Sequence, residues 1–327
     1  MISFVSLSPS ADVTYLVDEF VEGGTYRPTG VFRVAGGKAL NAARAARELG
    51  ASVRAVAILG GSAGAFIRKD LAALGVPLEA VLASVETRTC VSIASAASGL
   101  LTELYEHPSA VTVGELESLH QILGRPADAG WWAISGGMPS SVPVDELAGL
   151  IRLGHSLGQK VAIDSHGVPL AAALDARPDL VKVNRREAAE VLVSSLGTNI
   201  FDLALRIRDS TGGRVVITDG ANGSVALDSV ALDSVAANTV AADGPASVYR
   251  GSRWRATWTG TFGRYPVGSG DSYLGGLLTG LDRGDSFDAA VRLAAGAATA
   301  NALVPGAGVF AAEDAALIAA QVVVTAD

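Results

Sequence analysis

The feature that most constrains the fold of this chain is a repeated alternation from residue 36 onward. Short runs of β-branched apolar residues alternate with longer segments that are rich in Ala and Leu and have helical periodicity. This alternation is typical of a parallel sheet covered by helices. The predicted strands are 53–59, 131–134, 160–163, 180–183 and 214–218, and two of the predicted helices are 65–74 and 144–157, which end at Gly75 and Gly158.

Two stretches depart from this alternation, residues 13–34 and residues 87–113. In both of them Thr, Val, Ile and Tyr mix with polar residues, a pattern that favours twisted antiparallel strands. We expect the two stretches to form a small second sheet together.

A short tandem duplication lies further along the chain, where Ser-Val-Ala-Leu-Asp occupies residues 224–228 and again 229–233. Two copies of five residues are too few and too short for a solenoid, so we interpret them as a local duplication in a strand or hairpin. Residues 236–252 are rich in Ala, Asn, Gly, Asp and Ser, and we predict a loop there.

The composition argues against several classes of protein. With 327 residues, of which 49% are hydrophobic, the chain can bury one large core or two unequal ones. The net charge of −8 and the lack of a block of Lys or Arg argue against nucleic-acid binding. The single cysteine, Cys90, can form neither an internal disulfide nor a multi-cysteine metal site, and the N-terminus lacks the features of a signal peptide, so we expect a cytoplasmic protein. We expect no membrane segment, because polar residues and a proline interrupt the most apolar stretch.

The most informative segment is residues 265–272, a glycine-rich turn followed by leucines at helical spacing. A helix that begins here directs unpaired backbone N–H groups and the positive end of its dipole at one point, which suits phosphate oxygens. Gly268 and Gly270 let a ligand approach the backbone, and Asp271 adds a carboxylate beside the bound anion. Phosphoryl transfer needs both parts, amides that stabilise charge and a base that accepts the hydroxyl proton. In isolation, Asp271 as a simple helix cap explains the segment equally well.

A second glycine turn, Gly36-Gly37, precedes a predicted helix that runs to Leu49. Lys38 and Asn41 lie three residues apart and therefore on one face of its first turn, where they could hold a hydroxylated or phosphorylated substrate. This is not a Walker A loop, because Ala39 stands where Ser or Thr is required and Phe32 where Gly is required. A glycine turn beside a solvated lysine is the alternative interpretation.

Two further turns follow predicted strands. Asn184 and Glu187 come directly after the strand 180–183, at the end of a parallel sheet where ligands gather. Such a pair can orient magnesium directly or through water. A capping box, with Asn184 at the N-cap and Glu187 reaching back, is an equally good local explanation. Residues 218–223 follow the next strand and could run along a nucleotide, although alone they indicate only a turn.

Taken together and in order, these segments resemble the PfkB (ribokinase-like) carbohydrate kinases along nearly the whole chain. The resemblance implies that Asp271 is the catalytic base and that the anion hole consists of Gly268, Ser269 and Gly270. The implied substrate-binding residues are Asp12, Gly36, Gly37, Lys38, Asn41, Arg88, Glu103 and Ser135. The implied nucleotide-binding residues are Asn184, Thr218, Gly220, Gly223 and Asn301, and the implied magnesium-associated residue is Glu187, acting through water.

Other segments are similar to those of 1-phosphofructokinases and tagatose-6-phosphate kinases, namely 59–67, 86–90 and 101–104. This similarity favours a phosphorylated ketohexose as the acceptor. Lys38 and Arg88 are the candidate cations for the acceptor phosphate, because Arg offers a bidentate fork and Lys a point charge. Three positions depart from the usual residues, namely Ser8, Ser141 and Val183, and Tyr105 occupies a variable position of the lid.

The resemblance also implies a fold and an activity. The implied fold is α/β, a single ribokinase-like domain over residues 1–327 with a doubly wound, mostly parallel sheet, helices on both faces and a small β-sheet lid formed by residues of about 12–34 and 86–112. The implied reaction transfers a phosphoryl group from ATP, with Mg²⁺, to a hydroxyl of fructose 1-phosphate, tagatose 6-phosphate or fructose 6-phosphate, with Asp271 as general base. A homodimer formed through the lid is a further expectation.

Two other hypotheses stay open at this point. One is a ribokinase- or nucleoside-kinase-type enzyme that uses an unphosphorylated sugar. The other is a catalytically silent sensor that binds a sugar phosphate without transferring a phosphoryl group.

Overall fold

The computed structural model describes residues 1–126, 128–229 and 253–326. Within these ranges one large sheet contains ten strands, in the spatial order β14 (Val323–Ala326), β13 (Arg253–Thr257), β12 (Ser224–Leu227), β11 (Arg214–Thr218), β10 (Leu180–Asn184), β9 (Lys160–Asp164), β8 (Trp131–Ser135), β1 (Ile2–Ser6), β4 (Val53–Leu59) and β5 (Leu78–Leu82). All strands from β11 to β5 run parallel, and β12, β13 and β14 continue the sheet in antiparallel fashion.

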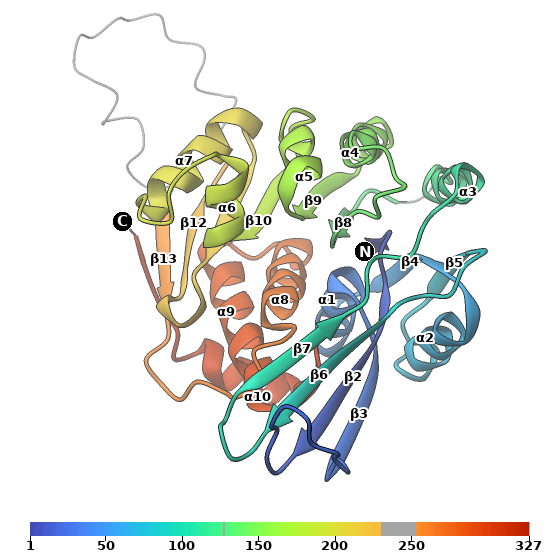
Figure 1. Cartoon of the computed structure of the whole chain (residues 1–327). Helices are drawn as coiled ribbons and strands as arrows, with labels where there is room; N and C mark the ends of the chain where they lie inside the picture. Colours follow the sequence, from blue (N-terminus) through green and yellow to red (C-terminus); the bar gives the residue numbers. More distant parts are fainter. Residues whose placement is uncertain (127, 230–252, 327) are drawn as a thin grey trace, which may run out of the picture.

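Helices cover both faces of this sheet (Figure 1). One face packs against α1 (Lys38–Glu48), α2 (Gly61–Ala73), α8 (Ser269–Arg283), α9 (Phe287–Leu303) and α10 (Ala312–Ala319). The other face packs against α3 (Val113–Leu123), α4 (Glu146–Ser156), α5 (Gly167–Leu174), α6 (Arg185–Val191) and α7 (Ile200–Thr211). Successive side chains of a strand point to opposite faces, so that Phe4 of β1 joins the first core and Val5 joins the second. The doubly wound arrangement is confirmed.

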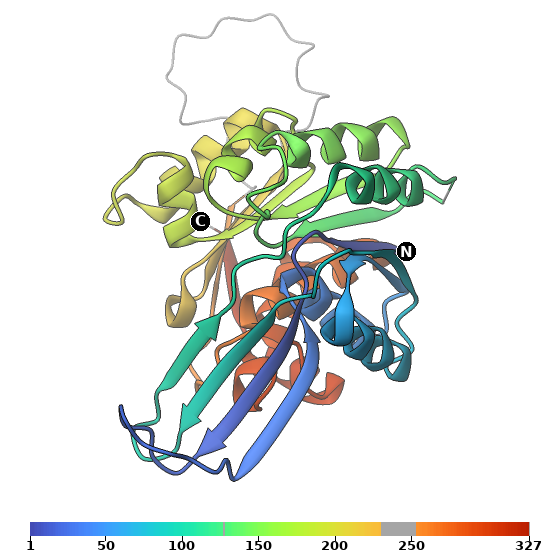
Figure 2. The ribbon, with the colours of Figure 1, turned by 45° about the vertical axis from the view of Figure 1, so that its right-hand side comes forward.

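A second sheet of four strands projects from this α/β body as an arm (Figures 1 and 2). It consists of β3 (Gly30–Gly36), β2 (Ser10–Val17), β6 (Thr89–Ser95) and β7 (Leu101–Tyr105), in that order. The prediction of a small separate sheet is confirmed, but the strands are not all antiparallel, because the central pair β2 and β6 is parallel. The reason is topological: β2 follows β1, and β6 follows β5, so both strands leave the body from the same end of parallel strands. We call this sheet the lid.

The predicted elements agree closely with the observed ones. β4 and β11 have the predicted bounds, and β8, β9 and β10 each extend one residue further. α2 begins earlier than predicted, and β1 was not predicted at all. The first copy of the duplicated Ser-Val-Ala-Leu-Asp forms β12 and the residue after it. Residues 230–233 of the second copy and the predicted loop 236–252 lie outside the described residues. In the part of the chain that is described, no helix is long and apolar enough to cross a membrane.

Candidate active site

Residues from widely separated segments meet at the carboxyl ends of the parallel strands. Asn41 on α1 donates a hydrogen bond of 2.9 Å from its Nδ2 to Oδ2 of Asp271 on α8. Lys38, at the start of α1, lies 3.0 Å from Glu187 of α6, measured from Nζ to Oε1. Three of the four predicted segments therefore share one site. This end of an open parallel sheet is where α/β proteins bind their ligands.

Asp271 lies in the first turn of α8 and is almost fully buried, with 8% of its surface exposed. Burial and, to a smaller extent, the neighbouring charge of Asp164 raise the pKa of its carboxyl to about 6. Lys38, Lys182 and the hydrogen bond from Asn41 oppose this rise. A carboxyl with this pKa is ionised near neutral pH and is a stronger base than an exposed aspartate, which is what proton abstraction from a hydroxyl requires.

The turn before α8 depends on its glycines. Gly268, the N-cap of α8, has a φ of 79°, and a Cβ atom there would lie 2.6 Å from Cα of Ala307. The first turn of any α-helix leaves its amides without intrahelical acceptors. A Cβ on Gly270 would lie 3.0 Å from Nζ of Lys182, so an ammonium group faces these amides. An ammonium group beside the amides of a helix N-terminus suits a phosphoryl group.

A cluster of charged side chains lies beside this turn. The carboxylate of Asp164 is fully buried at the end of β9 and bridges two ammonium groups, with Oδ1 2.8 Å from Lys38 and Oδ2 2.7 Å from Lys182. Although burial alone would raise it, the pKa of Asp164 is lowered by these two cations. Burial opposes the charge of Lys38, but Asp164, Glu187 and Asp271 hold its pKa above the usual value, so this lysine is charged. Lys38 is thus fixed between Asp164 and Glu187.

Asn184 and Glu187 form the capping box that the sequence allowed. The Asn184 Oδ1 accepts from the backbone N–H of Glu187 at 2.9 Å, and the Glu187 Oε2 accepts from the backbone N–H of Asn184 at 2.9 Å. Glu187 Oε1 still points to Lys38, so the same side chain caps α6 and faces the site. Among the described residues, no group of three or more His, Cys, Asp or Glu side chains could hold a metal ion alone. This donor set fits a magnesium ion that arrives with nucleotide phosphates and keeps its waters, and it does not form a protein cage.

The base of the lid lies beside the Gly36-Gly37 turn. The side chain of Asp12 on β2 lies against the Gly36 backbone, where a Cβ atom would be 2.0 Å from the carboxyl carbon. Ser10 donates a hydrogen bond of 2.6 Å to Asp12 Oδ1. Burial raises the pKa of Asp12, and Ser10, Arg44 and the Gly37 amide oppose the rise. Gly36 is therefore required by sterics, since any side chain would displace this carboxylate.

The remaining predicted substrate residues occupy different environments. The guanidinium of Arg88 donates to the backbone oxygens of Glu106, at 3.1 Å, and Ser8, at 3.2 Å, while its Nε is buried and has no partner among the described residues. The hydroxyl of Ser135 at the end of β8 is also buried without a partner there. Glu103 is different, because it is exposed on the edge strand β7 and accepts a hydrogen bond from Tyr105. Arg88 and Ser135 thus have polar capacity that a ligand could satisfy.

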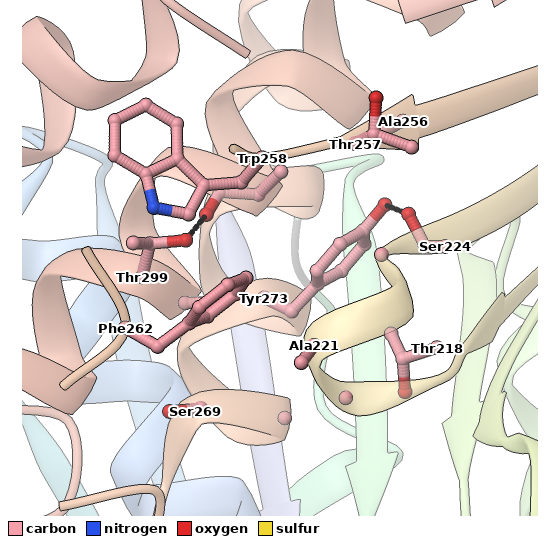
Figure 3. Close-up of a pocket in the computed structure, with 15 residues that line it drawn as sticks. Thr218, Ala221, Ser224, Ala256, Thr257, Trp258, Phe262, Ser269, Tyr273 and Thr299 are labelled. Atoms are coloured by element: carbon pink, nitrogen blue, oxygen red, sulfur yellow. Dashed lines mark hydrogen bonds between the residues drawn. The ribbon is translucent and has the colours of Figure 1, made fainter. Parts of the chain in front are cut away.

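A pocket lies beside the first turns of α8, between β11, β12, β13 and α9 (Figure 3). Its empty volume is about 590 Å³, part of which is open to solvent. The predicted loop residues Thr218, Gly220 and Gly223 line it, and Gly223 has a φ of 85° and packs so closely on the Ala256 oxygen that a Cβ atom would lie 2.0 Å away. The other lining residues are Ala221, Ser224, Ala256, Thr257, Trp258, Phe262, Ser269, Gly270, Tyr273, Ala295, Ala298 and Thr299. Since Ser269 and Gly270 line the pocket, it opens directly onto the start of α8.

Asn301 on α9 lies behind the α8 turn and does not line that pocket. Its side chain is fully buried, and its Nδ2 donates to the Val267 oxygen at 2.8 Å and to Ser269 Oγ at 3.2 Å. Its Oδ1 accepts from Ser272 Oγ at 3.1 Å and from the Gly308 amide at 2.7 Å. All of these contacts are internal, so the amide supports the shape of the turn.

Sequence reasoning gave no role to several residues that the structure brings to the site. Lys182 is a charge inside the apolar strand β10, and Asp164 follows the apolar part of β9, so each carried a detectable signal as a polar residue within or at the end of a buried strand. Trp258 and Phe262 gave no such signal, because they come from a loop and reach the pocket only through the tertiary fold.

Comparison with known proteins gives a consistent result. The chain matches the description "pfkB family carbohydrate kinase" over residues 3–242. It is similar to phosphofructokinase-2 from Escherichia coli, solved in complex with substrates and products, with 26% identity, a TM-score of 0.86 and coverage of 98% of both chains. The same enzyme in complex with fructose-6-phosphate matches with 25% identity, a TM-score of 0.84 and coverage of 98% of both chains. A possible 1-phosphofructokinase from Thermotoga maritima shares the fold, with 18% identity, a TM-score of 0.82 and coverage of 100% of this chain and 99% of the other.

The family match covers well over half of the chain and includes the glycine turn at Gly36, the lid and the segment around Asn184. The similar solved structures extend over nearly the whole length, including α8. This chain therefore belongs to the pfkB family of carbohydrate kinases, and it is a phosphotransferase that acts on an alcohol group.

Proposed function

We propose that this protein is an ATP-dependent kinase that phosphorylates a hydroxyl of a ketohexose monophosphate to give the bisphosphate, with Asp271 as the general base. The observation that carries the proposal is the buried Asp271 carboxyl, which Asn41 holds at the first turn of α8. A base and a set of helix amides at one point are the two parts that phosphoryl transfer to a hydroxyl needs.

In the proposed reaction, the acceptor hydroxyl gives its proton to Asp271 while its oxygen attacks the γ-phosphorus of ATP. The bond between that phosphorus and the β,γ-bridging oxygen breaks, and ADP leaves. The amides of Gly268 and Gly270, together with the Lys182 ammonium, stabilise the charge on the transferred group. The Ser269 amide donates to the Pro266 oxygen at 3.1 Å and so helps to hold the turn. The lid, by covering the acceptor, excludes water that would otherwise compete for the phosphoryl group.

We assign the pocket between β11, β13 and α9 to the nucleoside of ATP. It opens onto the α8 turn through Ser269 and Gly270, so a nucleotide that occupies it directs its phosphates at the predicted anion hole. Trp258 and Phe262 offer aromatic surface to the adenine base of ATP (Figure 3). Thr218, Gly220 and Gly223 form the wall along which the sugar and phosphates run.

Magnesium would be held on the side of this site formed by Glu187, with Asn184 beside it, mainly through water and nucleotide phosphates. When bound, the ion neutralises part of the phosphate charge. Lys38 and Lys182 contribute further positive charge there, and Asp164 fixes the position of both ammonium groups.

The preference for a phosphorylated acceptor rests on Arg88. Its buried Nε without a partner among the described residues lies at the base of the lid, near Asp12, whose pKa it lowers. A guanidinium binds phosphate strongly through paired hydrogen bonds. Lys38 is already held by two carboxylates, so Arg88 is the better candidate for the acceptor phosphate. Ser135 and Asp12 are suited to the sugar hydroxyls.

The test is ADP release from Mg-ATP by the purified protein, with fructose 6-phosphate, fructose 1-phosphate, tagatose 6-phosphate, fructose, ribose and adenosine as acceptors. Turnover with one or more sugar phosphates and none with the unphosphorylated acceptors is the expected result. Turnover with ribose or adenosine alone would replace the acceptor class with a ribokinase or nucleoside-kinase type. Sugar-phosphate binding without ADP release would support the silent sensor.

We also propose that two chains pair through their lids. Apolar side chains are exposed on this sheet, with 42% of Val31 and 59% of Leu104 accessible, and such surface favours association. A solution mass of two chains that falls to one chain in Leu104→Glu would support lid pairing, and an unchanged mass would contradict it.

A further inference from the structure

A deeply buried cation outside the charged cluster described above is Arg44 on α1. Only 6% of its side chain is exposed, and burial lowers the pKa of its guanidinium while Asp70 and Asp12 oppose that effect. A buried guanidinium costs free energy unless its N–H groups are satisfied, so its partners show what the fold gains by burying it.

On one side, Arg44 holds the junction between the lid and the body. Its Nη2 donates to the backbone oxygen of Ala35, the residue before the Gly36-Gly37 turn, and lies 3.3 Å from Asp70 Oδ2. The same Asp70 oxygen accepts from the Ala35 amide at 2.8 Å. Both backbone polar groups of Ala35 are therefore fixed by this ion pair.

On the other side, Arg44 holds the support of the anion hole. Its Nη1 donates to the Ala307 oxygen at 2.6 Å. Ala307 is the residue against which Gly268 packs, and the neighbouring Gly308 amide donates to Asn301, which supports the α8 turn. A displacement of Ala307 would therefore reach the turn that precedes α8.

Arg44 also faces the residue that holds the proposed base. Its Nη1 lies 3.4 Å from Asn41 Oδ1, while Asn41 Nδ2 donates to Asp271. A donor on the oxygen side of the amide favours the orientation in which the NH₂ group faces the carboxylate. The guanidinium thus connects three parts of the site that come from distant segments of the chain.

We propose that Arg44 is a positioning residue that holds the acceptor turn, the Asn41 amide and the support of the anion hole in one geometry. This inference rests on the proposed function only for its kinetic consequence. The guanidinium of Arg44 contacts Ala35, Asn41, Asp70 and Ala307, so we expect it to act on the reaction through these residues. Its removal should therefore slow transfer much more than it weakens nucleotide binding.

The kinetic test compares Arg44→Met and Arg44→Lys with wild type. Displacements on the order of 1 Å cost about 100-fold in rate, so we expect Arg44→Met to lower kcat about 10- to 100-fold. Arg44→Lys keeps the charge beside Asp70 but cannot reach both backbone oxygens. Its kcat should therefore lie between those of wild type and Arg44→Met. ADP affinity, measured by calorimetry, should change less than about twofold. An equal loss of ADP affinity and kcat would overturn the proposal, because it would indicate general damage.

A double-mutant cycle separates positioning from a purely structural role. If Arg44 acts largely through Asn41, Arg44→Met should cost at most about threefold in kcat in an Asn41→Ala background. Fully additive losses would contradict the coupling. Arg47→Met, an exposed arginine of the same helix, is the matched control and should leave kcat and ADP affinity unchanged.

Hydrogen exchange tests the same coupling without any turnover. In Arg44→Met we expect faster exchange of the amides of Ala35 and Gly308, and no change in Arg47→Met. Faster exchange at one of the two amides only would overturn the proposed connection. If the wild type phosphorylates none of the acceptors, the proposed function fails, while the exchange result still decides whether Arg44 joins these segments. A melting curve for each variant confirms that it is folded.

Discussion

The two halves of the candidate active site differ in charge. Among the described residues that line the pocket assigned to the nucleoside, none has a charged side chain, and all are Gly, Ala, Ser, Thr or aromatic. The other half, which we assign to the acceptor, contains the ionisable side chains of Asp12, Arg88 and Asp271. Under this assignment we expect shape and aromatic surface to select the donor and charge to select the acceptor.

The charged half should be the more sensitive to substitution. Asp271→Asn removes the proposed base but keeps the size of the side chain, so turnover should fall by roughly two to four orders of magnitude. ADP affinity should stay within about twofold of wild type, because the nucleoside pocket does not contain this side chain. Single-turnover kinetics and calorimetry measure the two quantities. A variant with nearly normal turnover would remove Asp271 from the mechanism.

Arg88→Met should break the selectivity for a charged acceptor. Loss of a charge-assisted contact to phosphate costs about 1.5–3 kcal/mol, so kcat/KM for a sugar phosphate should fall about 10- to 100-fold. Any residual rate with an unphosphorylated sugar should change little, since that substrate has no phosphate to lose contact with. Arg125→Met is the matched control, because Arg125 has 63% of its side chain exposed and pairs with Glu79 on a different surface. Equal losses for both acceptors would show that Arg88 has a structural role.

Trp258→Ala should weaken the binding of the nucleotide and leave the binding of the acceptor unchanged. Loss of aromatic contact with the base is worth on the order of 1 kcal/mol, which corresponds to about five- to tenfold in ADP affinity, and the KM of the sugar should not change. Trp131 and Trp132 are buried in the cores, so ADP should change the fluorescence of Trp258 more than that of the others. Trp254→Phe is the control, because Trp254 packs edge-on against Phe287 and does not line the pocket. A fluorescence change that persists in Trp258→Ala would mean that the nucleotide base binds away from Trp258.

The sequence allowed prediction of those parts of the site that depend on local chemistry. Gly268 and Gly36 were found because a turn that needs a glycine leaves a signal within a few residues. Asn184 and Glu187 were predicted for a similar reason. The Glu187 carboxylate both completes the capping box and contacts Lys38. The two interpretations that the sequence left open are therefore not exclusive.

Contacts across distant segments could not be predicted in this way. Arg44 is one of several arginines in the sequence, and only the packing of Ala35 and Ala307 around it makes it a buried connector. The direction of β6 relative to β2 likewise depends on where both strands leave the body. The acidity of Asp271 is also a tertiary property, since it is set by burial and by Asp164.

The raised pKa of Asp271 leads to a last expected effect, which concerns stability and not activity. The pKa of Asp271 is raised from about 4 in the unfolded chain to about 6 in the folded protein, so the folded state favours the protonated form. Above pH 6 the carboxyl is ionised in both states, and the folded state then bears the cost of a buried charge, which is at most about 3 kcal/mol for a shift of this size. The cost shrinks as the pH falls through 6 and is lost below about 4. Asp271→Asn should therefore raise the free energy of unfolding by about 1–3 kcal/mol at pH 8 and by progressively less towards pH 5, as measured by urea denaturation across this range. A gain in the free energy of unfolding that does not depend on pH would contradict this account. It would mean that neighbouring groups stabilise the ionised Asp271 carboxylate enough to offset the cost of its burial.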